Sequence, residues 1–135
     1  MSTRSNIAIY NTETETARVI YCHFDGYYDG VGKTLKEHYQ DVEKVKKLIE
    51  GGDISSLGEH VEIPNGEKHD YNNRNTEFDI TTFYGRDRGE TGINAKTRYL
   101  SKDKLHRLKA NEYLYVFLEK EGFWLCTHTK ELVEL

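Results

Sequence analysis

The sequence predicts an α+β fold with a largely antiparallel sheet and helices packed on one of its faces. β-like runs occur at both ends of the chain, helix-like runs lie between them, and the two do not alternate regularly. The 135 residues can form one hydrophobic core and are too few for two ordinary domains, so we expect a single domain over residues 1–135. The uncovered sheet face would carry Tyr, His and Trp side chains, on which a planar ligand could stack.

The first elements are expected to form a hairpin. Residues 7–11 and 16–24 are β-like and are separated by a polar Thr-Glu-Thr-Glu stretch. In the second run, alternation places Tyr21 and His23 on one face and Cys22 on the other, so both faces would be at least partly covered.

A helical region follows the hairpin. Thr34 and Glu37 form a Thr-x-x-Glu capping box that predicts a helix start, and Asp41 is a second candidate cap. Gly51 and Gly52 predict the end of the helical region. Apolar residues spaced three or four apart predict one bent helix or two short ones; they are Val31, Leu35, Tyr39, Val42, Val45, Leu48 and Ile49.

The second half of the chain begins with a loop-like stretch and returns to regular structure. Residues 53–75 contain the only proline and many turn-forming residues, so we expect them to be the most mobile part, with disorder confined to residues 62–77. Five elements should follow: a strand over 78–84, a short strand over 95–100, a short helix capped by Ser101, and a hairpin of strands 112–119 and 123–128.

Composition limits the classes of function. The net charge of -4 argues against a general nucleic-acid binder, although it leaves room for a local basic site. No apolar run reaches the ~18 residues that a membrane span needs. Cys22 and Cys126 lie in β-like runs of a chain that opens without a secretory signal pattern, so we expect buried free thiols and a cytoplasmic location.

The clearest candidate binding motif is Tyr84-Gly85-Arg86-Asp87-Arg88-Gly89-Glu90. Guanidinium groups grip phosphate or carboxylate through paired hydrogen bonds, and flanking glycines allow close approach of the backbone. This pattern predicts an anion-binding loop. The alternative is a charge cluster that only holds a turn to the surface.

His23 and Asp25 are the candidate catalytic pair. They would lie on one side of the strand if the strand continues that far, and a carboxylate beside an imidazole can tune a general acid or base. The alternative is a histidine bonded to the neighbouring turn. Cys22 is a poor nucleophile partner for His23 because consecutive strand residues point to opposite faces. The histidine spacings match no common metal motif, and Asp29–Thr34 lacks the first glycine of a phosphate-binding loop.

Several stretches resemble a family of small proteins of tailed bacteriophages and prophages that begin with Met-(Gly/Ser)-Thr-Arg-Ser. The matching segments cover most of the chain and lie at residues 1–5, 21–27, 32–39, 52–57 and 82–90. The chain departs from the family at Tyr28-Asp29, where relatives often have a proline, and in the loop after Leu57. The resemblance implies a phage origin, hence a host cytoplasm, and a shared site, but no particular activity.

These observations favour a protein that binds an anionic, nucleotide-like or ADP-ribose-like small molecule and sequesters a host defence signal. The expected ligand-binding residues are Thr3, Arg4, Ser5, Tyr21, Tyr27, Tyr84, Arg86, Asp87 and Arg88. One alternative is a phosphoester or nucleotide hydrolase that uses His23 and Asp25. Another is a protein inhibitor of a host factor that uses the lysine-bearing helix. No cofactor or metal is expected, and the sequence leaves open whether the chain forms a homo-oligomer.

Overall fold

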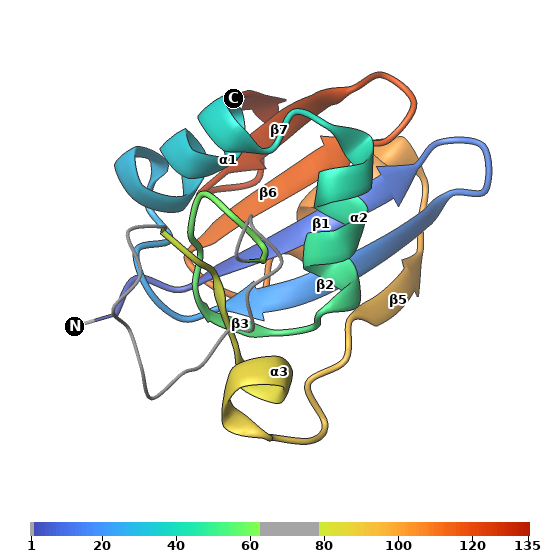
Figure 1. Ribbon diagram of the computed structural model, residues 1–135. Helices are drawn as coiled ribbons and strands as arrows, with labels where there is room; N and C mark the ends of the chain where they lie inside the picture. The colour runs from blue at the N-terminus through green and yellow to red at the C-terminus, as the bar shows by residue number, and fades with distance from the viewer. Residues whose placement is uncertain (1, 63–78) are drawn as a thin grey trace.

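A computed structural model describes residues 2–62 and 79–135, and a mixed β-sheet forms its centre (Figure 1). Within these residues the strand order is β4-β3-β2-β1-β6-β7-β8, and β5 also pairs with β2. The strands are β1 (Ser5–Asn11), β2 (Thr16–Cys22), β3 (Ile54–Ser56), β4 (Thr82–Phe83), β5 (Lys96–Tyr99), β6 (Tyr113–Leu118), β7 (Phe123–Thr127) and β8 (Val133–Glu134). The helices are the π-helix η1 (Tyr28–Gly32), α1 (Lys33–His38), α2 (Val42–Glu50), α3 (Tyr84–Arg88) and the 3₁₀-helix η2 (Lys102–Leu108).

Both expected hairpins are present, but the sheet between them is not simply antiparallel. β1 pairs antiparallel with β2, and β6 with β7. The two hairpins join through β1 and β6, which run parallel, with Ile7 opposite Tyr115. β2 and β3 are also parallel where Cys22 meets Ile54. The α+β class is therefore confirmed, whereas the largely antiparallel sheet is only partly matched.

The helices α1 and α2 cover one face of the sheet and bury its main aromatic residues (Figure 1). The indole N–H of Trp124 donates to the Tyr39 carbonyl at 2.9 Å, and the Tyr39 hydroxyl donates to the Gly58 carbonyl at 2.8 Å. These bonds let two large polar aromatics sit in the core without unpaired groups. The prediction that Trp lies on an uncovered face is wrong, because Trp124 packs beneath the helices.

The opposite face is covered in part by η2. Leu105 and Leu108 of η2 are buried against Ala8, Tyr10 and Ala17 of the first hairpin. A 3₁₀-helix places residues three apart on one side, so both leucines reach the sheet. The expectation of helices on only one face is therefore corrected.

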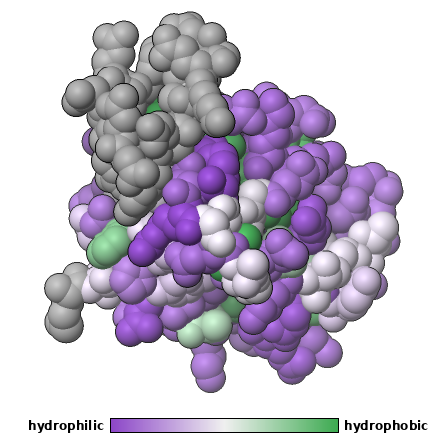
Figure 2. All heavy atoms as spheres, turned by 60° about the horizontal axis from the view of Figure 1, so that its bottom comes forward, coloured by the Kyte–Doolittle hydropathy of each residue, from purple (hydrophilic) through white to green (hydrophobic). Residues whose placement is uncertain are grey.

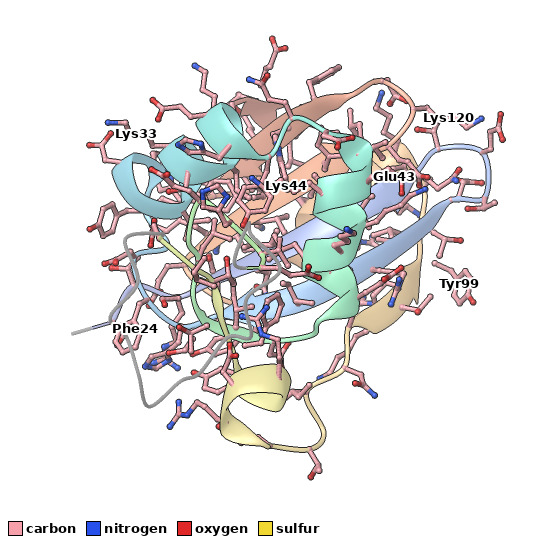
Figure 3. The ribbon with its side chains drawn as sticks, viewed as in Figure 1. Phe24, Lys33, Glu43, Lys44, Tyr99 and Lys120 are labelled. Carbon is pink, nitrogen blue, oxygen red and sulfur yellow. The ribbon has the colours of Figure 1, made fainter. Side chains whose placement is uncertain are left out.

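The helix boundaries follow the predictions in part. Asp41 caps α2, with its carboxylate accepting from the Glu43 N–H at 3.2 Å, and α2 ends at Glu50 with Gly51 as its C-cap, where the helix end was expected. The first helical segment instead begins at Tyr28 and passes from η1 directly into α1, so Thr34 is not a cap. Lys44 fixes the two helices to the sheet edge, because its ammonium donates to the carbonyls of His38 and Glu59 at 2.6 Å each (Figure 3).

The segment expected to be a loop contains a short strand. Ile54–Ser56 forms β3, because it pairs with β2 on one side and β4 on the other. Most of the stretch expected to be disordered, and the expected strand start at Phe78, lie outside the described residues. Across 2–62 and 79–135, no helix has the length and apolar character needed to cross a bilayer.

Candidate functional site

The candidate site is centred on Tyr21, near the end of β2. Its side chain lies on the face covered by η2, because Tyr21 stands opposite Asn6 and shares a face with Ala17 and Val19. The Asn6 side-chain oxygen accepts a hydrogen bond from the Ala110 N–H at 2.9 Å, just past the end of η2. Tyr21 lies next to this junction and stays partly exposed.

A chain of hydrogen bonds runs from Tyr21 to the N-terminal segment. The Tyr21 hydroxyl lies 2.6 Å from Nδ1 of His23, and Nε2 of the same ring lies 3.1 Å from the Ser2 hydroxyl. A neutral imidazole with its proton on Nε2 satisfies both contacts, since Tyr21 then donates to Nδ1 and His23 donates to Ser2. His23 is thus oriented by a tyrosine.

Arg4 also contacts Tyr21. The Arg4 guanidinium lies near the Tyr21 hydroxyl and favours its ionised form, yet burial outweighs this effect and raises the pKa of Tyr21 above its usual value. The Arg4 backbone N–H donates to the Glu112 carboxylate. This bond holds the N-terminal segment beside the sheet while the Arg4 residue remains exposed.

The predicted arginine loop is a short helix, α3, and it brings a second tyrosine to the site. Tyr84 lies close enough to Tyr21 to raise the pKa of its hydroxyl. The Arg88 guanidinium stacks 5.2 Å from the centre of the Tyr84 ring and pairs with Glu90 at 3.5 Å. The side of the molecule on which α3 lies is predominantly hydrophilic (Figure 2).

Asp53 connects the two tyrosines through the backbone. Its carboxylate accepts from the Tyr21 N–H at 2.8 Å, and its carbonyl accepts from the Tyr84 N–H at 3.2 Å. Tyr21 lies between the part of β2 that pairs with β5 and the residue that pairs with β3, so Asp53 replaces a missing strand partner there. Burial raises the pKa of Asp53.

Arg86 does not share this site. Its guanidinium donates to the carbonyls of Val61 at 2.5 Å and Thr81 at 2.8 Å, and it pairs with Asp87 at 2.8 Å. It also stacks 4.6 Å from the Phe83 ring centre. Arg86 therefore holds α3 against the chain, which corresponds to the alternative interpretation of the motif.

Asp87 also has a structural contact. Its carboxylate accepts from the Phe83 N–H at 2.7 Å, so it caps the start of α3 while pairing with Arg86. Gly89 ends the helix with a left-handed φ of 68°, a conformation that glycine adopts without strain.

The side chains of Asp25 and Tyr27 bond each other and not His23. β2 ends at Cys22, and Asp25 takes a left-handed φ of 57°, so the strand alternation that would have paired it with His23 does not continue. The Asp25 carboxylate instead accepts from the Tyr27 hydroxyl at 3.3 Å. Asp25 lines a separate cavity of about 320 Å³ that also includes Asp29 and Asp79, an acidic setting that disfavours an anion.

Thr3 and Ser5 fix the N-terminal segment. The Thr3 carbonyl accepts from the Gly26 N–H at 2.8 Å. Ser5 is fully buried opposite Cys22, on the face away from Tyr21. Gly26 allows this close contact, because a Cβ at that position would lie 2.8 Å from the Thr3 oxygen.

The structure thus brings together six residues, which we call the Tyr21 cluster: Ser2, Arg4, Tyr21, His23, Tyr84 and Arg88. Sequence reasoning placed Ser2 in a polar N-terminal motif without assigning it a role, and it missed Asp53 and Glu112. Asp53 follows the predicted Gly51-Gly52 helix stop, but nothing local indicates a partner 32 residues earlier in the chain.

No family model, curated protein or solved structure shows a significant match to the chain. Within residues 2–62 and 79–135, no three His, Cys, Asp or Glu side chains are arranged to hold a metal ion. The geometry of the Tyr21 cluster and its charges are therefore the basis for a functional assignment.

Proposed function

We propose that the Tyr21 cluster binds a phosphorylated small molecule of the nucleotide or ADP-ribose type. One observation carries the proposal: Arg4, from the N-terminal segment, and Tyr84, from α3, both lie near Tyr21 although they are 80 residues apart in sequence, and Arg88 stacks on the Tyr84 ring. Two guanidinium groups beside tyrosine rings suit a ligand with a charged end and a planar end.

Each residue has a distinct role in this proposal. Arg4 and Arg88 hold the phosphate, the rings of Tyr21 and Tyr84 pack against the base, and His23 orients Tyr21 through the hydrogen bond to its hydroxyl. Arg86 is left out because its donors are already bonded to carbonyls and to Asp87.

Sequestration is favoured over catalysis. His23 is bonded to Tyr21 and Ser2, and Asp25 points into a different, acidic cavity. The arrangement lacks the His-Asp pair on which the hydrolase hypothesis depended. With the phage origin that the sequence motifs imply, a protein that captures a host defence nucleotide without altering it is the function we assign.

Calorimetric titration against a panel of nucleotides and ADP-ribose tests the proposal. We expect a ligand with a dissociation constant well below about 1 mM, and Arg4→Gln or Arg88→Gln should each weaken it by about tenfold or more. Arg18→Gln is the matched control. Arg18 is an exposed arginine on β2 that pairs with Thr97 of β5, and strand alternation places its side chain on the face away from Tyr21.

Two results would count against this function. One is the absence of binding to every member of the panel. The other is equal binding by the Arg4, Arg88 and Arg18 variants. Recovery of intact ligand after heat denaturation separates sequestration from turnover, since a hydrolase would return an altered molecule.

A further inference from the structure

Basic residues are concentrated in one segment of this acidic chain. Residues 94–110 contain six lysines and arginines and a single acidic residue, Asp103, although the whole chain carries a net charge of -4. Net charge averages over the entire surface, whereas binding depends on the local field. The position of these residues in the fold therefore decides what they can contact.

The segment forms one continuous surface on the sheet face opposite α1 and α2. Arg98 of β5 stands opposite Ala17 of β2, and Lys96 opposite Val19, so both cations share a face with these two residues. Ala17 belongs to the same apolar cluster as Leu105 of η2. β5 and η2 therefore lie side by side on this face. We call the exposed cations of these two elements, together with the partly buried Lys109 that follows η2, the basic surface; its members are Lys96, Arg98, Lys104, Arg107 and Lys109.

Most of this charge is not neutralised. Among the residues that the structure describes, Arg98, Lys104, Arg107 and Lys109 form no ion pair. Asp103 accepts from the Ser101 hydroxyl at 2.5 Å, and its pKa is lowered by that bond and by the nearby Lys104 and Arg107. One carboxylate among several cations leaves a positive field.

The surface lacks the features of a protein-binding site. Leu105 and Leu108 are only 0% and 3% exposed, so η2 offers no apolar anchor of the kind that dominates protein interfaces. Tyr99 is 80% exposed but belongs to the other face, where it stands opposite Thr16 and projects away from the sheet edge (Figure 3). A surface that offers positive charges but no exposed apolar side chains suits a partner with regularly spaced negative charges.

We propose that the basic surface binds the phosphate backbone of single-stranded nucleic acid. The affinity would come from counterion release, which each neutralised phosphate provides. η2 lies flat on the sheet through its two leucines and cannot enter a groove, so base-specific reading of duplex DNA is not available to this surface. A flexible strand can follow such a flat surface.

Fluorescence anisotropy with a labelled oligothymidylate of about 20 nucleotides, in about 50 mM salt, tests this inference. The variant R98Q/K104Q/R107Q removes three charges from the basic surface. The control K33Q/K36Q/K47Q removes three exposed charges from α1 and α2 on the opposite face, so both proteins have the same net charge.

We expect the unmodified protein and the control to bind within about twofold of each other, and R98Q/K104Q/R107Q to bind at least about tenfold more weakly with a salt slope smaller by about 2. Equal binding by both variants, no binding by the unmodified protein, or tighter binding to a duplex of the same length would overturn the proposal. None of the substituted residues belongs to the Tyr21 cluster, so nucleotide titration of the same variants separates this inference from the proposed function.

Discussion

The carboxylate of Asp53 accepts a hydrogen bond from the backbone N–H of Tyr21 at 2.8 Å, in the gap where β2 changes its strand partner. The Asp53 carbonyl accepts from the Tyr84 N–H at 3.2 Å. A single residue thus sets the backbone positions of both tyrosines, although it does not line the ligand site itself.

Asp53→Ala should destabilise the protein by about 1–2 kcal/mol, because the Tyr21 N–H loses its acceptor in a partly buried position. Asp53→Asn keeps an acceptor oxygen and removes a charge that burial disfavours, so its stability should stay within about 0.5 kcal/mol of the unmodified protein. Urea unfolding measures both variants. Equal loss of stability in Asp53→Asn and Asp53→Ala would mean that the charge of Asp53, and not its hydrogen bond, stabilises the fold.

The two arginines of α3 should respond differently to removal. Arg86→Ala should cost about 2–3 kcal/mol of unfolding free energy, because the carbonyls of Val61 and Thr81 lose charged donors and Phe83 loses its stacked guanidinium. Arg88→Ala should cost less, about 1 kcal/mol, since it loses an exposed pair with Glu90 and the stacking on Tyr84.

Thermal unfolding of the two α3 variants, followed by nucleotide titration, checks this contrast. Arg88→Ala should lose ligand affinity while keeping a higher melting temperature than Arg86→Ala. If Arg86→Ala proved as stable as Arg88→Ala, the structural role assigned to Arg86 would be wrong.

Gly26→Ala should loosen the N-terminal segment. The new methyl group would lie 2.8 Å from the Thr3 carbonyl oxygen and 2.9 Å from the Ser5 Cβ, so the segment that carries Ser2 and Arg4 must shift. We expect faster amide hydrogen exchange at residues 2–5 and weaker ligand binding. Gly122→Ala strains the backbone, because Gly122 has a φ of 80°, but no atom lies within 4 Å of its added Cβ, so exchange at residues 2–5 should stay as in the unmodified protein. Unchanged exchange in Gly26→Ala would contradict the contact.

Alkaline pH should destabilise the fold. Burial raises the pKa of Cys22 from 9.0 to about 12 and that of Tyr39 from 10.0 to about 12. Between about pH 10 and 12 the unfolded chain loses both protons while the native state keeps them, so each group lowers stability by about 1.4 kcal/mol per pH unit. Urea midpoints measured at successive pH values should fall through this window; constant midpoints would exclude it.

The same burial protects the thiols. Cys22 and Cys126 are both free and buried, and burial raises the pKa of each. We expect a chromogenic disulfide reagent at pH 8 to react with neither thiol in the native protein and with both after unfolding in urea. Rapid reaction of the native protein would show that one of the two strands opens readily.

Local sequence patterns predicted the elements whose stability is local. The apolar spacing from Val31 to Ile49 predicted the buried helical stripe. Asp41 was correctly predicted as a helix cap, and the polar turns predicted both hairpins. In each case the determining contacts lie within a few residues along the chain, and periodicity records them.

Long-range contacts decided the rest. The parallel pairing of β1 with β6 joins residues about 110 positions apart, and no local pattern distinguishes it from an antiparallel pair. The Tyr84–Arg88 segment was predicted as a loop because of its glycines, yet Asp87 and Arg86 fold it into α3 through contacts with Phe83, Val61 and Thr81.

The candidate site was predicted in part for the same reason. Arg4, Tyr21, His23, Tyr84 and Arg88 do lie together, whereas Arg86, Ser5 and Asp25 point elsewhere. Residue type indicated which side chains could bind an anion. Only the fold shows which of them face one site.

A double-mutant cycle between Arg4 and Arg88 tests the central claim most directly. If both guanidiniums hold one phosphate group, Arg4→Gln and Arg88→Gln should each weaken nucleotide binding by about tenfold or more, and the double variant should lose at least about 0.5 kcal/mol less than the sum of the two. Full affinity in the double variant would contradict the account.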